Sequence, residues 1–454
     1  MIQIIYELEN REFDNALLLS AELKRRGYEV EIIHKATCLK NRSQKGVLIV
    51  PNCYNSENYN FFRYMLNSKN NPIINLQYEQ VLSKNWEKIG YHNPKGEAKN
   101  AITLCWGNNS YQRLLSNGLS ENNLKVTGAI HLDFLSNSFS EFYLQKNEIA
   151  KSMNLDVRKK WILYISSFTM AEDKGVVAEK LMNSFEGEKE MIQDFVDVSV
   201  KSREITLKWI EEILLEDENI CFLYRLHPNE IEDETLSHLE QTYPKRFICV
   251  NKYSVKQWIH VSDIVLTWFS TSIIECFYAK KHCYILRPFK IPLDMDSVVF
   301  TDAKVISDYT EFRERLIQNN TVFSKLAFPI NKNLIEEYYS NDEKHLAYIE
   351  IANIIEASLG SEVKKVSKKY YIQRLRFLVF HSEAWKSYIE KMYSKLYSIF
   401  HIKLSRISPW KKRYLAVIEK RVGNWTEINQ EINRKNDLLK KIVRNIQSSH
   451  QENT

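Results

Sequence analysis

MIQIIYELENREFDNALLLSAELKRRGYEVEII, residues 1–33, changes from a strand pattern to a helix pattern and back. Residues 2–6 form a β-branched run, residues 14–26 place apolar side chains at helical spacing, and residues 29–33 form a second short strand. Gly27 follows the helical segment and suits its C-cap. The pattern predicts a βαβ unit.

Both halves of the chain continue this alternation. In the first half, further strands are predicted at 46–51, 72–79, 101–107 and 124–128. In the second half, apolar strands are predicted at 161–168, 220–228, 246–250, 263–271 and 282–288. Because strands that alternate with helices form parallel sheets covered on both faces, the sequence predicts an α/β protein with two Rossmann-like domains. We expect the carboxyl ends of their strands to face a ligand cleft between the domains.

The expected organisation has four parts: an N-terminal Rossmann-like domain (1–145), a C-terminal one (146–335), a helix that crosses back to the first domain (336–360), and a tail (361–454). The tail holds 21 Lys and Arg against 8 Asp and Glu, a net charge of +13, whereas the whole chain carries +6. The basic character therefore belongs to the tail, which we expect to be helical because it contains a single glycine, Gly423.

Composition excludes several classes of protein. Of the 454 residues, 44% are hydrophobic and 26% are charged, which suits a globular protein and excludes a mainly disordered one. The seven cysteines are odd in number and never form a CxxC pair, so we expect buried thiols in a reducing compartment, with no disulfide framework and no zinc site. The first residues have no secretory signal pattern, and no apolar run is long enough to span a membrane. We expect a cytoplasmic protein.

The tail contains a candidate amphipathic helix. Its apolar residues recur at steps of three and four: Trp385, Ile389, Met392, Leu396 and Phe400. Lys and Arg flank this stripe, so the helix could lie on an anionic membrane surface, or pack on the protein body or a partner subunit. No nucleic-acid-binding module accompanies the positive charge, so we expect no nucleic-acid partner.

The motifs that could carry chemistry follow strands of the second domain. GxGxxG, Walker A, HExxH and GxSxG patterns are absent from the sequence. In YRLHPNE, a strand leads into Arg225, His227 and Pro228, where a cation and an imidazole could hold phosphate oxygens, or form only a strand-ending turn.

Two Ser/Thr-rich turns add to this motif. In DIVLTWFSTSIIE, the residues Ser270, Thr271 and Ser272 precede a helix, where hydroxyls and free N–H groups could bind an anion or merely cap the helix. Glu275, one turn later, could accept hydrogen bonds from ribose hydroxyls or be an ordinary first-turn acid. In ISSFTMAED, Ser166 and Ser167 follow the first strand of the domain. Three such turns at one edge of a parallel sheet predict a nucleotide-donor site.

These segments, together with WGNNSYQRLLSNGLSENNLKVTGAIHLDFL, resemble bacterial glycosyltransferases of the GT-B fold that build capsule and lipopolysaccharide. The resemblance covers about residues 1–320 and is strongest to the Kdo-transferase-like, polysialyltransferase-like and glycerophosphotransferase-like groups, which use CMP- or CDP-activated donors. It implies that His227 and Pro228 with Arg225 match the His-Pro element of those groups. It also implies that Ser270, Thr271 and Ser272 match their phosphate-binding element. The chain departs from the pattern after its VTG turn and lacks a clear acidic catalytic element of the polysialyltransferase type.

The acceptor side is expected in the first domain, where a base must take the proton of the acceptor hydroxyl. Glu12 and Glu79 follow predicted strands and are the first candidates, with Arg11 orienting an anionic group; each could also be an ordinary surface residue. Four further residues lie near strand ends and are weaker candidates: Glu7, Asp14, His131 and Asp133. The DxD triplet Asp294-Met295-Asp296 belongs to a loop after the last predicted strand, where its carboxylates are expected to be solvated, so we expect neither metal nor cofactor.

The sequence therefore predicts a metal-independent, membrane-peripheral glycosyltransferase on the inner face of the cell membrane. Its partners would be a nucleotide-sugar donor, a lipid-linked glycan acceptor and an anionic membrane contacted through residues 361–454, and a homo-oligomer is compatible with this interpretation. Four alternatives stay open: a sugar-nucleotide epimerase of the same architecture, a polyol-phosphate transferase, a non-catalytic scaffold of polysaccharide assembly, and a basic-tailed nucleic-acid binder.

Overall fold

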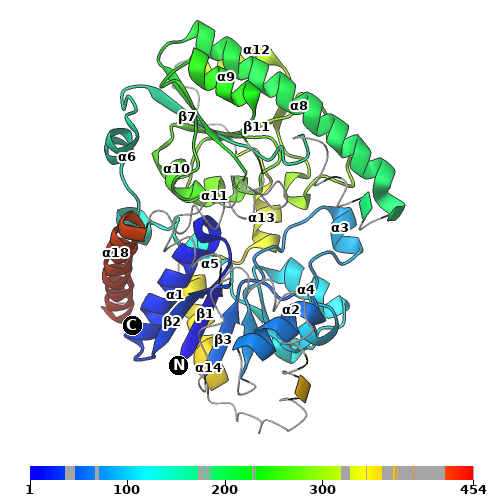
Figure 1. Ribbon diagram of the computed structural model, residues 1–454, viewed down its shortest axis with the longest axis vertical. Coiled ribbons are helices and arrows are strands. Elements are labelled where there is room, and N and C mark those ends of the chain that lie inside the picture. The colour runs from blue at the N-terminus through cyan, green and yellow to red at the C-terminus, as the bar shows by residue number, and fades with distance from the viewer. Residues whose placement is uncertain are drawn as a thin grey trace. The chain divides into compact units, whose positions relative to one another are not determined.

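The computed structural model contains two compact units, each built around a parallel sheet (Figure 1). Unit 1 comprises Met1–Gln80, His92–Phe134 and Ser340–Thr454, and unit 2 comprises Val81–Tyr91 and Leu135–Tyr339. The structure describes residues 1–35, 46–66, 71–171, 178, 182–183, 186–227, 230, 232–317, 328–343, 345–359, 372–373, 376, 392 and 425–452.

The sheet of unit 1 has six parallel strands in the order β2-β1-β3-β4-β5-β6. Its strands are β1 (Ile2–Tyr6), β2 (Val30–His34), β3 (Val47–Val50), β4 (Ile73–Asn75), β5 (Ile102–Cys105) and β6 (Leu124–Val126). Its principal helices are α1 (Asp14–Arg25), α2 (Ser56–Phe61), α4 (Asn108–Ser116), α5 (Ile130–Asp133), α14 (Ala347–Leu359) and α18 (Trp425–Glu452). A short π-helix, Glu9–Phe13, leads into α1. The central strands β1, β3 and β4 are buried almost throughout, which explains their apolar runs, whereas the edge strands β2 and β6 are partly exposed.

The predicted βαβ unit is confirmed, including the end of its helix. Gly27 has a φ of +91°, and the N–H of Tyr28 donates to the carbonyl of Leu23 at 3.0 Å, a helix ending that requires a left-handed residue. The strand predicted at 72–79 is shorter than expected, because Gln77 has a φ of +51° and turns the chain after β4.

The sheet of unit 2 also has six parallel strands, in the order β12-β11-β10-β7-β8-β9. Its strands are β7 (Lys160–Ile165), β8 (Ile220–Arg225), β9 (Phe247–Cys249), β10 (Ile264–Thr267), β11 (Cys283–Leu286) and β12 (Val305–Ile306). Its helices are α3 (Lys84–Lys88), α6 (Lys146–Met153), α8 (Lys189–Glu216), α9 (Glu234–Thr242), α10 (Val255–Val261), α11 (Ile273–Tyr278), α12 (Tyr309–Ile317) and α13 (Lys332–Tyr338). Counted from β7, this is the 3-2-1-4-5-6 strand order of a Rossmann sheet.

The core of unit 2 is rich in aromatic rings. Tyr164 stacks on Tyr224 with ring centroids 5.3 Å apart, and Phe168 stacks on Trp268 at 4.8 Å. The long helix α8 contributes Phe195 to this cluster. These rings lie beneath the carboxyl ends of β7, β8 and β10 and give the loops there a rigid base.

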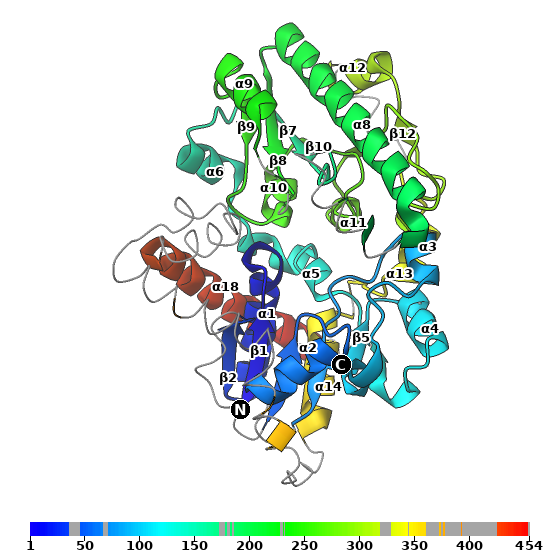
Figure 2. The ribbon, with the colours of Figure 1, turned by 45° about the vertical axis from the view of Figure 1, so that its right-hand side comes forward.

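The end of the tail is part of unit 1. Helix α18 packs on α1, as Figure 2 shows, and four of its apolar residues are 0–6% exposed: Leu439, Ile442, Val443 and Ile446. This segment therefore packs on the protein body. Of the amphipathic stripe predicted earlier in the tail, only Met392 is among the described residues, and it is exposed. Within the described residues, no helix combines the length and apolarity that crossing a membrane requires.

Candidate functional site

The strand order of unit 2 reverses between β7 and β10, and the predicted donor residues follow these two strands and β8. The register aligns Ile165 with both Arg225 and Thr267, so the three strands end at the same level. In open α/β sheets, ligands bind outside the carboxyl ends of strands at such a reversal. The polar turns that the sequence singled out therefore lie at one edge of the sheet.

Arg225, the last residue of β8, is a buried cation without an acidic partner in the described part of the chain. Arg225 is only 8% exposed. Its Nη1 donates to the carbonyls of Val250 and Lys252 at 3.2 and 3.3 Å. Burial lowers its pKa to about 10, and no carboxylate of the described residues offsets this effect. A buried charge that lacks a counter-ion is energetically costly, and an anionic ligand would supply one.

His227 is held through its backbone by Glu230. The N–H of His227 donates to Glu230 Oε2 at 3.1 Å, and the N–H of Glu230 donates to the carbonyl of His227 at 2.8 Å. Glu230 Oε1 also accepts from Ser166 Oγ at 2.8 Å and from Tyr224 OH at 3.0 Å. Burial raises the pKa of Glu230 despite these hydrogen bonds. Pro228 lies outside the described residues.

In this network the hydroxyl of Ser166 is bonded to protein groups, whereas the sequence predicted that it binds the donor ligand. Ser166 is 1% exposed, and its hydroxyl lies between Glu230 and Tyr224. The hydroxyl joins the β7 turn to the β8 turn. Ser167 Oγ is enclosed and has no hydrogen-bond partner within the described part of the chain. Glu230 was missed by the sequence analysis, although it stands three residues after His227 in the HPNE motif.

The second Ser/Thr turn is ordered by its own hydroxyls. Thr267 Oγ1 donates to the carbonyl of Ile165 at 3.2 Å and accepts from the N–H of Ser270 at 3.0 Å. Ser270 Oγ accepts from the N–H of Ser272 at 3.3 Å, and Thr271 is exposed. Helix α11 has only six residues, so its dipole contributes less to an anion site than the sequence suggested.

Glu275, on α11, has a strongly perturbed carboxyl group. Burial raises its pKa to about 7, and the charge of Lys256 only partly offsets this effect. A carboxyl group that titrates near neutrality can exchange a proton or accept a hydrogen bond from a neutral hydroxyl.

The acceptor residues predicted in unit 1 form one connected cluster. Arg11 Nη1 contacts Glu79 Oε1 at 3.0 Å, and Arg11 Nη2 contacts Glu12 Oε1 at 3.0 Å. Glu79 Oε2 in turn lies 2.8 Å from His92 Nε2. Burial raises the pKa of Glu79, but the hydrogen bonds and charges of His92 and Arg11 outweigh it and lower this pKa to about 2. Glu79 is therefore ionised at neutral pH.

The carboxylate of Glu12 is buried and bonded to the backbone, whereas a base that acts on the acceptor would have to be accessible to it. Glu12 is 1% exposed, and its Oε2 accepts from the backbone N–H groups of Glu7 and Leu8 at 2.7 and 3.2 Å. Its carboxylate thereby closes the turn before the π-helix and holds Arg11. The geometry favours an orienting role for Glu12.

His92 was missed by the sequence analysis. Two contacts hold His92. Its ring contacts Glu79, and its backbone carbonyl accepts from Gln77 Nε2 at 2.7 Å. Its ring lies 4.5 Å from that of Tyr54. His92 lies far along the chain from Arg11, in a stretch without a motif, so periodicity gave no signal for it.

The weaker candidates of unit 1 have structural partners. Asp133 is 2% exposed and accepts from the N–H groups of Ala347 and Tyr348 at 3.0 and 2.8 Å, which caps α14. His131 makes an edge contact with Trp106, with ring centroids 5.1 Å apart. Glu7 pairs with Lys35, and Asp14 pairs with Lys435.

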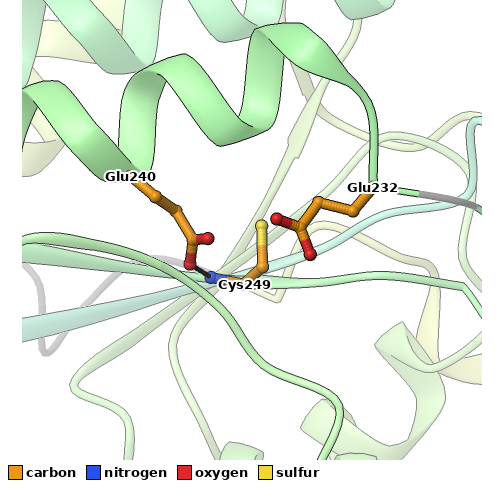
Figure 3. Close-up of side chains that lie close together, drawn as sticks. All are labelled: Glu232, Glu240 and Cys249. Carbon is orange, nitrogen blue, oxygen red and sulfur yellow. Dashed lines mark hydrogen bonds between the residues drawn. The ribbon is translucent and has the colours of Figure 1, made fainter.

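One group of described residues in unit 2 could hold a metal ion. Figure 3 shows the carboxylates of Glu232 and Glu240 on either side of the thiol of Cys249, and the three ligand atoms lie within 4.8 Å of one another. Glu240 Oε1 accepts from the N–H of Cys249 at 2.6 Å, so hydrogen bonding already explains part of this arrangement. Cys249 is the last residue of β9 and pairs in register with Tyr224 of β8, so the group lies at the carboxyl end of β9, next to the turn after β8.

No protein-family model matches the chain, and no curated protein matches its sequence. Among solved structures, the chain is similar to the wall teichoic acid polymerase TagF in a variant soaked with CDPG, at a TM-score of 0.50 and 12% identity, over 79% of this chain and 88% of that chain. It also matches the UDP-GlcNAc 2-epimerase of Methanocaldococcus jannaschii in complex with UDP-GlcNAc and UDP, at a TM-score of 0.46 and 12% identity, over 78% and 99%. A co-structure of S. aureus MnaA with UDP matches at 0.46 and 13% identity, over 81% and 98%.

The likeness to TagF extends over both units, each of which has its own parallel six-stranded sheet. The fold class expected from the sequence is therefore confirmed: the chain has the GT-B fold.

Proposed function

We propose that the protein is a glycosyltransferase of surface polysaccharide biosynthesis. It would transfer a sugar from a CMP- or CDP-type donor to a lipid-linked glycan acceptor. In this proposal the edge of the unit 2 sheet binds the donor phosphate, and the Arg11, Glu79 and His92 cluster of unit 1 serves the acceptor. The GT-B fold, shared with a polymerase whose structure was determined after a CDPG soak, supports this class of chemistry.

The observation that carries the proposal is the buried guanidinium of Arg225. It lies at the carboxyl end of β8, next to the reversal of strand order, and its hydrogen bonds go to two neutral carbonyls. Arginine matches phosphate in both charge and donor geometry. A nucleotide phosphate bound there would pair with the charge of Arg225, and the ordered turns at Ser166 and Ser270 would line the same edge.

Each residue then has a defined task in the transfer. The acceptor oxygen attacks the anomeric carbon of the donor, and the bond from that carbon to the phosphate oxygen breaks. Arg225 stabilises the negative charge that develops on the departing phosphate. His92 takes the proton of the acceptor hydroxyl, while the ionised Glu79 fixes the orientation of the His92 ring. Glu275 would accept from the ribose hydroxyls, and no step calls for a metal ion.

Nucleotide binding tests the donor half of the proposal. In calorimetric titrations, we expect CMP or CDP to bind more tightly than UDP or GDP. Arg225→Met should weaken binding about 10- to 100-fold, since a hydrogen bond to a charged group contributes about 1.5–3 kcal/mol. Preference for UDP would favour the epimerase alternative, and turnover of a polyol-phosphate donor would favour the phosphotransferase. No response to any of the four nucleotides would favour a scaffold and contradict the proposal.

Arg246→Met is the matched control for Arg225. Within the described residues, Arg246 also donates only to backbone carbonyls, those of Leu214 and Asp217 at 2.6 Å and of Ile220 at 3.3 Å. It precedes β9 and so lies at the amino end of the sheet. Its replacement should reduce stability and leave nucleotide affinity unchanged. Equal loss of affinity in both variants would contradict a phosphate-binding role for Arg225.

We also propose that residues 361–424 bring the enzyme to the inner face of the membrane. The positive charge of the tail and the stripe predicted around Trp385 support this assignment. Flotation with anionic and neutral vesicles is the direct measurement. Binding that ignores vesicle charge, or no binding at all, would contradict it.

A further inference from the structure

The chain's last helix is tied to the turn that carries Arg11. Lys435, on α18, places its Nζ 2.8 Å from Asp14 Oδ1 and 3.3 Å from Glu431 Oε1. Asp14 is the first residue of α1 and directly follows the π-helix Glu9–Phe13. The contact therefore joins residues 421 positions apart at the start of α1.

This ion pair is largely shielded from water. The side chain of Lys435 is 19% exposed and that of Asp14 is 10% exposed. Burial lowers the pKa of Lys435, but the charges of Asp14 and Glu431 outweigh it and raise this pKa above its ordinary value. Leu439 lies one turn after Lys435 on the same face of α18 and is fully buried. Packing of this face therefore fixes the position of Lys435.

Two further ties hold the same turn, both from within the first 80 residues. Glu12 accepts from the N–H groups that precede the π-helix, and Asn15 Nδ2 donates to the carbonyl of Arg11 at 3.1 Å and to Tyr78 OH at 3.2 Å. The position of the Arg11 guanidinium therefore depends on the start of α1. Lys435 supplies the tie from the far end of the chain.

We propose that Lys435 is a positioning residue for the acceptor cluster: through Asp14 it fixes the start of α1 and so aligns Arg11 with Glu79. The C-terminal helix would then influence transfer without touching either substrate. This inference rests on the proposed function of unit 1, but its structural step can be measured without turnover.

Lys435→Met tests the inference in the full chain, and Lys440→Met is its control. Lys440 lies on the same helix, but its pair with Asp437 is exposed, with side chains 54% and 77% accessible. Hydrogen exchange is the first readout. In Lys435→Met, the amides of Glu7 and Leu8, which donate to Glu12, should exchange faster, and in Lys440→Met they should not. Unchanged exchange at these amides would overturn the proposal.

Kinetics with donor and acceptor give the second readout. We expect Lys435→Met to lower kcat by about tenfold or more, because small displacements of positioning groups are costly in rate. Its affinity for the nucleotide should stay at the wild-type value, since the donor edge belongs to unit 2. Lys435→Arg should restore most of the rate. A variant that loses thermal stability but keeps wild-type kcat at a temperature where it is folded would show a purely structural role and refute the inference.

The two proposals fail in different ways. If the wild-type protein binds no nucleotide and transfers no sugar, the proposed function fails, while the exchange experiment still decides whether Lys435 orders the Arg11 turn. If the wild-type protein is active and Lys435→Met has wild-type kcat, the positioning role alone fails.

Discussion

Replacing Glu79 by Gln removes one negative charge from the centre of the unit 1 cluster while preserving the size of the side chain. Glu79 contacts Arg11 Nη1 at 3.0 Å and His92 Nε2 at 2.8 Å. In the variant, Arg11 keeps Glu12 as its one acidic partner among the described residues, and His92 loses the carboxylate that holds its ring. We expect a loss of stability and a loss of turnover, with nucleotide affinity unchanged.

The pKa of Glu79 sets the size of the effect. Burial raises this pKa, but His92 and Arg11 lower it from 4.5 to about 2. At about 1.4 kcal/mol for each tenfold change in proton affinity, the interactions of the ionised group contribute at most about 3.4 kcal/mol. Because 38% of the side chain is exposed, solvent screening reduces this figure, and we expect about 1–2 kcal/mol at neutral pH.

The sign of the pH dependence follows from the lowered pKa. A carboxyl group with a lower pKa in the folded protein stabilises the fold above the pKa of the unfolded chain, about 4.3, and loses this contribution as the pH falls toward about 2. Urea unfolding of wild type and Glu79→Gln should therefore differ by about 1–2 kcal/mol at pH 7 and converge near pH 2. Glu29→Gln, which alters an exposed acid of the same unit, should match the wild type throughout. Identical stability and identical pH profiles for Glu79→Gln and the wild type would refute the reasoning.

Three further changes test other parts of the structure. Because burial raises the pKa of Glu275 to about 7, its ionisation opposes folding; wild-type stability should fall between about pH 4.5 and 7, and thermal unfolding of Glu275→Gln should lack this decline. Glu230→Gln weakens the acceptor of three hydrogen bonds and should lower the free energy of unfolding by about 1–3 kcal/mol. It should also reduce nucleotide affinity in calorimetric titrations. Unchanged affinity would show that Glu230 does not contribute to the proposed donor site. Leu439→Ala should cost about 2–5 kcal/mol in denaturant unfolding, and the half-buried Leu438→Ala clearly less, whereas equal effects would contradict the packing of α18.

The placement of the proposed donor residues at one edge of the unit 2 sheet was largely predictable, because these residues follow strands directly. Apolar runs marked β7, β8 and β10, and in a parallel sheet the residues after such strands must share one edge. Arg225 and the Ser270 turn were found in this way. The roles of single side chains were not predictable: Ser166 looked like a ligand-binding hydroxyl in the sequence, whereas its hydroxyl is enclosed by Glu230 and Tyr224.

The cluster of unit 1 that we propose for the acceptor was predictable only in part. Arg11, Glu12 and Glu79 were identified as polar residues near strand ends, but their connection was not visible, because 67 positions separate Glu12 from Glu79. His92 was missed for the same reason. It reaches Glu79 because the chain turns at Gln77, where φ is +51°, and neither composition nor spacing indicates that turn.

The sequence by itself determined the alternation of strands and helices, the two parallel sheets and the basic tail, since periodicity and charge are local properties that each segment carries with it. Only the tertiary structure decided that Arg225 has no acidic partner among the described residues, that Glu79 joins Arg11 to His92, and that Lys435 reaches Asp14. These are contacts between distant segments, and they depend on which strands become neighbours and how tightly their side chains are enclosed. Burial, which determines the energetic weight of each charge, exists only once the chain has folded.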